Sequence, residues 1–248
     1  MTKLTSLLRK VALGQTGGSE KETVHFLHIG KAAGTQITHV ASQINASGAP
    51  FEIRKRKHGV SLSDLPPDAR YFFSIRNPID RFKSGFYSRK RKGQPRIYSE
   101  WSDHEAKAFE TYEHANDLAE ALFSDGDMGH RATAAILSIH HNARYQIDWL
   151  KPLGFALSIR PPVWIIRTEG FEDDLGNLLD RLGADVDIQV SDDPSHRHQN
   201  DYSSIPALSP RAEQNLRRWY SQDFAFYDMC VDWMTRNFSR NQSLAGSA

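Results

Sequence analysis

The chain alternates between short apolar runs of strand length and longer segments in which apolar residues recur every three or four positions. The runs that predict strands are residues 24–29, 51–53, 71–75 and 163–167. The segments with helical spacing are residues 35–44, 105–123, 131–140, 171–182 and 210–234. Strands that alternate with helices favour an α/β fold with a central, mostly parallel sheet flanked by helices.

The junction after the first apolar run carries the first candidate chemistry. Residues 30–35 read Gly-Lys-Ala-Ala-Gly-Thr, and a helix-compatible segment follows. Backbone N–H groups of such a loop and of a helix N-terminus point at a bound anion, and Lys31 adds a positive charge. A Walker A loop reads Gly-x-x-x-x-Gly-Lys-Ser/Thr, whereas here His25 stands five residues before Gly30 and Ala32 follows the lysine. The sequence therefore predicts a P-loop-like three-layer fold that binds a phosphate-like anion, and it argues against an ordinary ATP or GTP site.

The junction after residues 71–75 predicts a second anion site. Asn77 is a natural N-cap, and Pro78 suits the first position of a helix. Arg76 therefore stands at the carboxyl end of the strand, and Ser84 lies two turns into the next helix. An arginine fork and a hydroxyl from the two sides of a strand–helix junction can bind one anion.

Together the two junctions resemble the sulfotransferases that use 3′-phosphoadenosine-5′-phosphosulfate (PAPS). That family's first loop reads close to Pro-Lys-x-Gly-Gly-Thr, from which this chain departs at Gly30 and Ala33. Its second motif, Arg-Asp/Asn-Pro-x-x-Arg-x-x-Ser, is matched in full by residues 76–84. Residues 58–62 resemble a histidine-led segment of the carbohydrate 2-O-sulfotransferase branch. Residues 165–174 and 208–224 resemble later family segments, so the similarity spans residues 24–230.

The resemblance implies an enzyme that transfers a sulfuryl group in line from PAPS to an acceptor hydroxyl, without a metal. Lys31 would stabilise charge on the leaving oxygen, and His58 would take the proton from the acceptor. The residues expected to bind PAPS are Lys31, Ala32, Ala33, Gly34, Thr35, Gln36, Arg76, Ser84 and Arg197.

Several assignments leave alternatives. Arg76 could form a surface salt bridge with Asp80, and Ser84 could simply be a small residue at a helix crossing. Asp80 and Arg81 are expected to be structural, as a first-turn charge and a helix-surface pair. Glu52 is the second candidate for the base.

The remaining histidines are expected to have no part in the chemistry. His25 and His28 belong to the first strand, where a histidine more often serves the core or the sheet surface. The pair at 140–141 is adjacent in a helix and would not share a face. The pair at 196 and 198 lacks partners for a metal, so no metal site is expected.

Composition fits one enzyme domain. The 248 residues include thirteen phenylalanines and five tryptophans, which argues against disorder, and one cysteine, Cys230, which excludes an intrachain disulfide and a cysteine zinc site. We expect a single domain over residues 23–238, a peripheral segment over 1–22 and a flexible tail over 239–248. Neither a signal peptide nor an apolar run of about twenty residues is found. Eukaryotic members of the resembled branch are anchored in the Golgi membrane, so this chain resembles a soluble bacterial member and is expected to be cytoplasmic.

Charge is unevenly placed along the chain. The net charge is +1, but residues 51–100 hold thirteen Lys and Arg against five Asp and Glu, with basic clusters at 54–57 and 89–92. Such a field would steer a polyanionic donor and an acidic acceptor. Nearby aromatics belong to apolar strands and helices, so no nucleic-acid partner is expected.

A saccharide or glycoconjugate is the expected acceptor, while small alcohols, glycolipids and peptidyl tyrosine stay open. One alternative function is a P-loop-like phosphotransferase, for which Ala32 supplies no magnesium ligand. The other is a non-catalytic module that binds polyanions.

Overall fold

The computed structural model describes residues 21–151, 156–184, 186, 188–189 and 204–245. Its centre is a four-stranded sheet of β1 (Glu22–Leu27), β2 (Phe51–Lys55), β3 (Tyr71–Ile75) and β4 (Ile165–Arg167). The strand order is β2-β1-β3-β4, and every pair is parallel. The expected α/β class with a parallel sheet is therefore confirmed.

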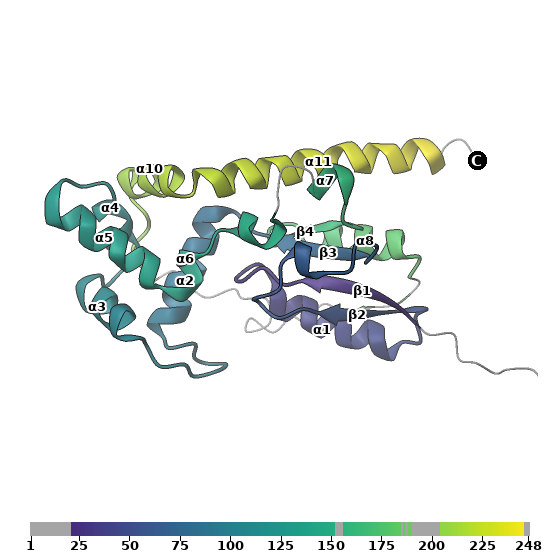
Figure 1. The fold of residues 1–248 in the computed structure, drawn as a ribbon, viewed down its shortest axis with the longest axis horizontal. Coiled ribbons are helices and arrows are strands. Elements are labelled where there is room, and N and C mark those ends of the chain that lie inside the picture. Colours follow the sequence, from purple (N-terminus) through teal and green to yellow (C-terminus); the bar gives the residue numbers. More distant parts are fainter. Residues whose placement is uncertain (1–20, 152–155, 185, 187, 190–203, 246–248) are drawn as a thin grey trace, which may run out of the picture.

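Helices cover the sheet on both sides and form a second lobe beside it (Figure 1). They are α1 (Gly34–Ala46), α2 (Pro78–Lys90), α3 (Asp103–Thr111), α4 (Ala115–Ala121), α5 (Gly126–Ser138), α6 (His140–Ala143), α7 (Ala156–Ile159), α8 (Phe171–Leu182), α10 (Pro210–Trp219) and α11 (Ser221–Ala245). The described residues also form 3₁₀ turns, η1 (Leu62–Asp64) between β2 and β3 and η2 (Gln146–Leu150) between α6 and α7. Among the described helices, none combines the length and apolar character that a membrane span requires.

In the part of the chain that the structure describes, buried apolar side chains form two cores. One lies between the sheet and the helices α1, α8 and α11, where the rings of Phe73 and Phe226 lie 6.2 Å apart. The other fills the helical lobe, which we define as α2 to α6 together with α10. Because α2 begins directly after β3, it joins the sheet to this lobe.

Several boundaries of strands and helices follow from the local sequence. The strand at 71–75 lies where it was predicted. Asn77 caps α2 by accepting a hydrogen bond from the N–H of Ile79 at 3.0 Å, and Pro78 is the first helical residue. Helix α8 ends at Gly183, whose φ of 64° lies in the left-handed region that glycine tolerates best.

Two predicted helices are each divided in the structure. The segment 105–123 forms α3 and α4, because the N–H of His114 bonds to the Asp117 carboxylate and begins a new helix. The segment 210–234 forms α10 and α11, with buried Tyr220 at the break, where its hydroxyl donates to the Asn142 carbonyl at 3.0 Å. Neither division has a proline or glycine to mark it.

The topology brings the two predicted anion junctions together. The chain runs from β1 outward to β2 and then returns past β1 to β3, so the connections after β1 and β3 leave the sheet in opposite directions. Leu27 is level with Phe73, and both strands end at the same edge. Ligands of parallel sheets bind at such a point, beyond the carboxyl ends of the strands. Lys31 follows the end of β1 and Arg76 follows the end of β3, so both lie at this edge.

Candidate functional site

The first loop (residues 28–33) has the backbone geometry of an anion-binding turn. Lys31 and Ala33 have positive φ values of 66° and 55°, while Ala32 between them does not. Each such non-glycine residue is strained by about 1 kcal/mol or more. Alternation of this kind turns successive N–H groups toward one point. The N-terminus of α1 follows, with no acidic residue in its first turn and no side-chain cap. These N–H groups therefore suit an anion.

Arg81 holds the first loop in place, so its expected position on the helix surface is wrong. Its side chain is only 3% exposed, and its Nε donates to the Gly30 carbonyl at 2.9 Å. Its Nη1 lies 3.8 Å from Oδ2 of Asp223 at the start of α11. Asp80 pairs with Lys83 instead, at 3.0 Å. Arg81 is thus structural, as expected, but as a buried link between the loop and α11.

His28 and Gly34 are in close contact. A Cβ atom on Gly34 would lie 1.9 Å from Nε2 of His28, so the buried His28 ring occupies the space of a side chain. The same ring lies against His58, with ring centroids 3.8 Å apart. The first loop, α1 and the segment that carries His58 are therefore packed through one imidazole.

The environment of His58 suits a base. Its carbonyl accepts hydrogen bonds from Trp149 Nε1 and Arg144 Nη1, both at 2.8 Å. Burial lowers the pKa of the His58 imidazole, and nearby cations act in the same direction, against a hydrogen bond to the His28 backbone that raises it. The ring is therefore neutral near pH 7. Glu52, the second candidate for the base, hydrogen-bonds to Thr23 and Arg54. It does not line the cavity that lies beside the first loop.

Lys31 lies among positive charges. Burial lowers its pKa to about 8, and the neighbouring arginines add to the effect. They are Arg76, Arg91, Arg96 and Arg81. Among the described residues, none forms a hydrogen bond or ion pair with the Lys31 ammonium. An anion is the natural complement of such a cluster.

Arg76 is positioned by a residue that sequence reasoning missed. The side-chain amide of Gln146 makes two hydrogen bonds to the backbone of Arg76. Its oxygen accepts from the Arg76 N–H at 3.0 Å, and its nitrogen donates to the Arg76 carbonyl at 2.9 Å. Gln146 is fully buried, and its own N–H bonds to Asp223 at 2.9 Å. Within the described residues, the Arg76 guanidinium has no ion pair, so the alternative pairing with Asp80 is absent there.

Ser84 in α2 and Gln36 in α1 are both buried, at 1% and 7% exposure. The Ser84 Oγ has no hydrogen-bond partner among the described residues. Buried hydroxyls nearly always have one, so this atom suits a ligand. Arg197 lies outside the described residues.

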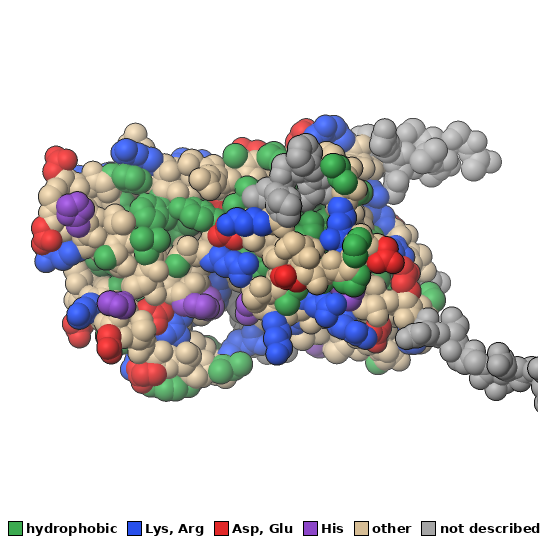
Figure 2. All heavy atoms as spheres, in the orientation of Figure 1, with side chains coloured by type: hydrophobic (Ala, Val, Ile, Leu, Met, Phe, Trp, Pro, Cys, Tyr) green, Lys and Arg blue, Asp and Glu red, His purple; other side chains and the backbone are tan. Residues whose placement is uncertain are grey.

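A cavity of about 1380 Å³ lies beside the first loop. Figure 2 shows a hollow between the helical lobe and the sheet, with Lys, Arg and His side chains along its rim. Of the predicted residues, Lys31, Gly34, Thr35 and His58 line the cavity, whereas Arg76, Ser84 and Gln36 do not. The structure thus places the two predicted catalytic residues on one cavity, which the predicted 3′-phosphate residues do not line.

His140 and His141 both line this cavity, although adjacent residues of a helix were expected to diverge. Helix α6 has only four residues, and the two rings lie 5.4 Å apart at its start. Burial, with Lys31 next in importance, lowers the pKa of His141 to about 3, so this ring is neutral.

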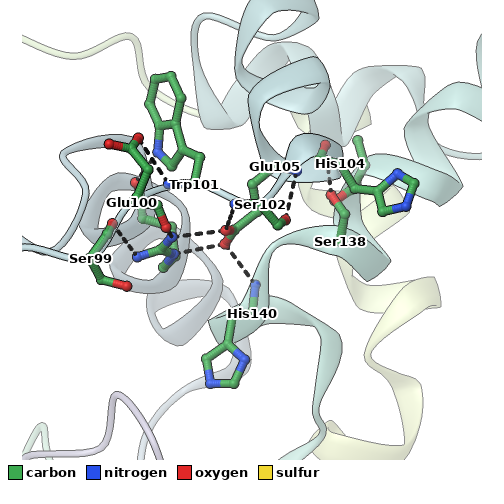
Figure 3. Close-up of polar contacts among 10 residues, drawn as sticks. Ser99, Glu100, Trp101, Ser102, His104, Glu105, Ser138 and His140 are labelled. Carbon is green, nitrogen blue, oxygen red and sulfur yellow. Dashed lines mark hydrogen bonds and ion pairs between the residues drawn. The ribbon is translucent and has the colours of Figure 1, made fainter.

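The basic cluster at 89–92 is not a uniform surface. Arg89 is buried and bonds Glu105 at 2.7 and 2.8 Å, and it donates to the carbonyls of Ser99 and Glu100. Although burial alone would raise the pKa of Glu105, these hydrogen bonds hold it at about 2. Figure 3 shows Glu105 between Ser102 and the backbone of His140. Arg89 is therefore a structural cation.

Within the described residues, no cluster of three or more His, Cys, Asp or Glu side chains could hold a metal. Comparison with the models of known protein families, with curated proteins and with solved structures found no match to this chain.

Proposed function

We propose that this protein is a sulfotransferase that moves a sulfuryl group from PAPS to a hydroxyl, and that the acceptor is a carbohydrate. The observation that carries the proposal is the meeting of two junctions at one sheet edge. The loop of Lys31 follows β1, and Arg76 follows the adjacent β3. A nucleotide with two separate phosphate groups needs two such anion sites on one scaffold.

The donor would be held by both junctions. The first loop and the start of α1 offer backbone N–H groups and Lys31 to the 5′-phosphosulfate. The 3′-phosphate would take the Arg76 fork and the buried Ser84 hydroxyl, for which the described residues supply no other partner. The four arginines that lower the pKa of Lys31 favour a polyanion over a neutral ligand.

Two residues would carry the chemistry. His58 accepts the proton of the acceptor hydroxyl as its oxygen attacks sulfur. Lys31 stabilises the electron pair left on the bridging oxygen as the sulfur–oxygen bond breaks, giving adenosine 3′,5′-bisphosphate. Both residues line the same cavity.

A saccharide suits that cavity. Its walls are rich in hydroxyl and imidazole groups, including Thr38, Ser42, Ser138 and His39, with the indole of Trp101 nearby. Its volume of about 1380 Å³ exceeds the roughly 300–1,000 Å³ of sites for small molecules. An acceptor of more than one sugar unit is the class that such a space admits.

The decisive experiment is calorimetric titration with adenosine 3′,5′-bisphosphate, with and without magnesium, and with ATP for comparison. We expect metal-independent binding that Arg76→Ala weakens by about 10- to 100-fold. Arg70→Ala is the matched control, because Arg70 stands at the opposite end of β3 and pairs with Glu22 at 2.7 Å. Preference for ATP with magnesium would replace this proposal with a phosphotransferase. Polyanion binding that the bisphosphate does not affect would replace it with a binding module. A positive result leads to an acceptor screen with labelled donor.

A further inference from the structure

The basic loop (residues 91–101) lines the cavity together with Lys31, Gly34 and Thr35. Its base is firmly braced: Lys92 pairs with Glu100 at 2.5 Å, and its ammonium lies 4.6 Å from the centre of the Trp101 ring. The Trp101 indole donates to the Arg89 carbonyl at 2.6 Å. Glu105 ties the same region to the start of α6, as Figure 3 shows. The loop is therefore positioned by its own cations and carboxylates.

Two cations of this loop line the cavity: Arg91 and Arg96. Arg96 reaches across to α1, where its Nη1 donates to the hydroxyl of Thr35. Among the described residues, no carboxylate pairs with Arg96, and Thr35 takes only one of its five N–H donors. Thr35 is in the first turn of α1, next to the predicted 5′-phosphosulfate site.

The positive charge of Arg96 also acts on Lys31, although the two residues are 65 positions apart in the sequence. Both Arg96 and Arg91 contribute to the lowered pKa of the Lys31 ammonium. Three cations from two separate segments thus converge on one end of the cavity. Bringing like charges together in a folded protein is unfavourable, which is characteristic of sites that bind an anion.

We propose that Arg96 binds the phosphosulfate end of the donor together with Lys31, so that the basic loop completes the donor site. This inference rests on the proposed function and adds a donor-binding residue to it. In transfer, the guanidinium would share the charge of the transferred group with Lys31, while its bond to Thr35 orients that hydroxyl. The acceptor oxygen still forms its bond to sulfur as the bond from sulfur to the bridging oxygen breaks. Arg96 exchanges no proton.

The experiment separates the contributions of the 3′-phosphate and the 5′-phosphate to binding. Adenosine 3′,5′-bisphosphate, adenosine 3′-monophosphate and adenosine 5′-monophosphate are titrated into wild type, Arg96→Ala, Arg96→Lys and Arg76→Ala. We expect Arg96→Ala to lose about 10- to 100-fold in affinity for the bisphosphate and the 5′-monophosphate, and to bind the 3′-monophosphate as wild type does. Arg76→Ala should show the reverse selectivity. Arg96→Lys should be intermediate, because it keeps the charge without the fork.

Each other outcome has a distinct meaning. If the affinity of Arg96→Ala for the bisphosphate is within about twofold of the wild-type affinity, the inference is wrong while the proposed function stands. The same holds if Arg96→Ala loses affinity for both monophosphates by the same factor. If wild type binds none of the three nucleotides, the proposed function fails and the inference fails with it. Arg70→Ala controls for loss of surface charge, and thermal melting of Arg96→Ala shows whether this exposed substitution leaves the fold intact.

Discussion

The imidazole of His28 lies where residue 34 would carry its side chain. A Cβ atom at Gly34 would come within 1.9 Å of Nε2 and 2.4 Å of Cδ2 of that ring. The φ of Gly34 is not positive, so the position needs glycine for space and not for conformation. The consequence concerns function, because the same ring supports His58 at a centroid distance of 3.8 Å.

We therefore predict that Gly34→Ala lowers the free energy of unfolding by about 1 to 3 kcal/mol through overpacking. In a His28→Ala background the same substitution should change it by less than about 0.5 kcal/mol, because the obstructing ring is gone. Urea denaturation of the four proteins of this double-mutant cycle measures both values. Equal effects in the two backgrounds would disprove the contact.

Lys31 is held in a site that disfavours its charge, so its removal should stabilise the protein. Its folded pKa of about 8 lies below the unfolded value near 10.5. The penalty is complete below pH 8, declines as pH rises, and is absent above about pH 10.5. Lys31→Met should raise the free energy of unfolding at pH 7 by up to about 3 kcal/mol and abolish bisphosphate binding. Lys83→Met, on the surface of α2, is the control; a destabilised Lys31→Met would contradict the prediction.

Nucleotide binding should depend on pH through the same lysine. A bound anion raises the pKa of Lys31, so above pH 8 binding takes up a proton. Affinity for adenosine 3′,5′-bisphosphate should be level between pH 7 and 8 and then fall by up to about tenfold per pH unit. Titrations in two buffers of different ionisation enthalpy detect the proton. No pH dependence up to pH 9.5 would show that the anion binds elsewhere.

His58 should affect transfer without affecting donor binding. Its pKa is lowered from 6.5, so the neutral ring is present near pH 7 and is lost only below pH 6.5. We expect kcat/KM for transfer to fall on the acid side below pH 6.5, and His58→Gln to lose activity by about 100-fold or more while binding the bisphosphate normally. Full activity in His58→Gln would assign the base elsewhere, with the neutral His141 as the next residue to replace.

Gln146 should matter to the nucleotide through Arg76. Gln146→Leu leaves the Arg76 N–H and carbonyl without their partners, so we expect the free energy of unfolding to fall by about 2 kcal/mol and bisphosphate affinity to fall as well. Gln43 makes the same two-sided contact with the backbone of Gln189 on the surface, at 2.9 and 3.0 Å. Gln43→Leu should therefore leave affinity unchanged. Equal affinity in both variants would mean that Arg76 needs no such support.

Whatever depends on neighbouring residues could be determined from the sequence. The strand at 71–75, the Asn77 cap of α2 and the end of α8 at Gly183 each follow from a local preference of backbone or side chain. The loop of Lys31 was identified in the same way, since a strand, small residues and a helix start are consecutive in the chain.

Contacts between distant segments were decided only by the tertiary structure. Arg81 lies in a helix with an ordinary surface pattern, yet it is buried because Gly30 and Asp223 meet there. Gln146 supports Arg76 across 70 positions, and Arg96 reaches Thr35 across 61. In the basic cluster at 89–92, Arg89 and Lys92 likewise pair with Glu105 and Glu100, which lie outside the cluster in the sequence. No local preference encodes such pairings, because their energy comes from desolvation and hydrogen bonds that exist only after the chain has folded.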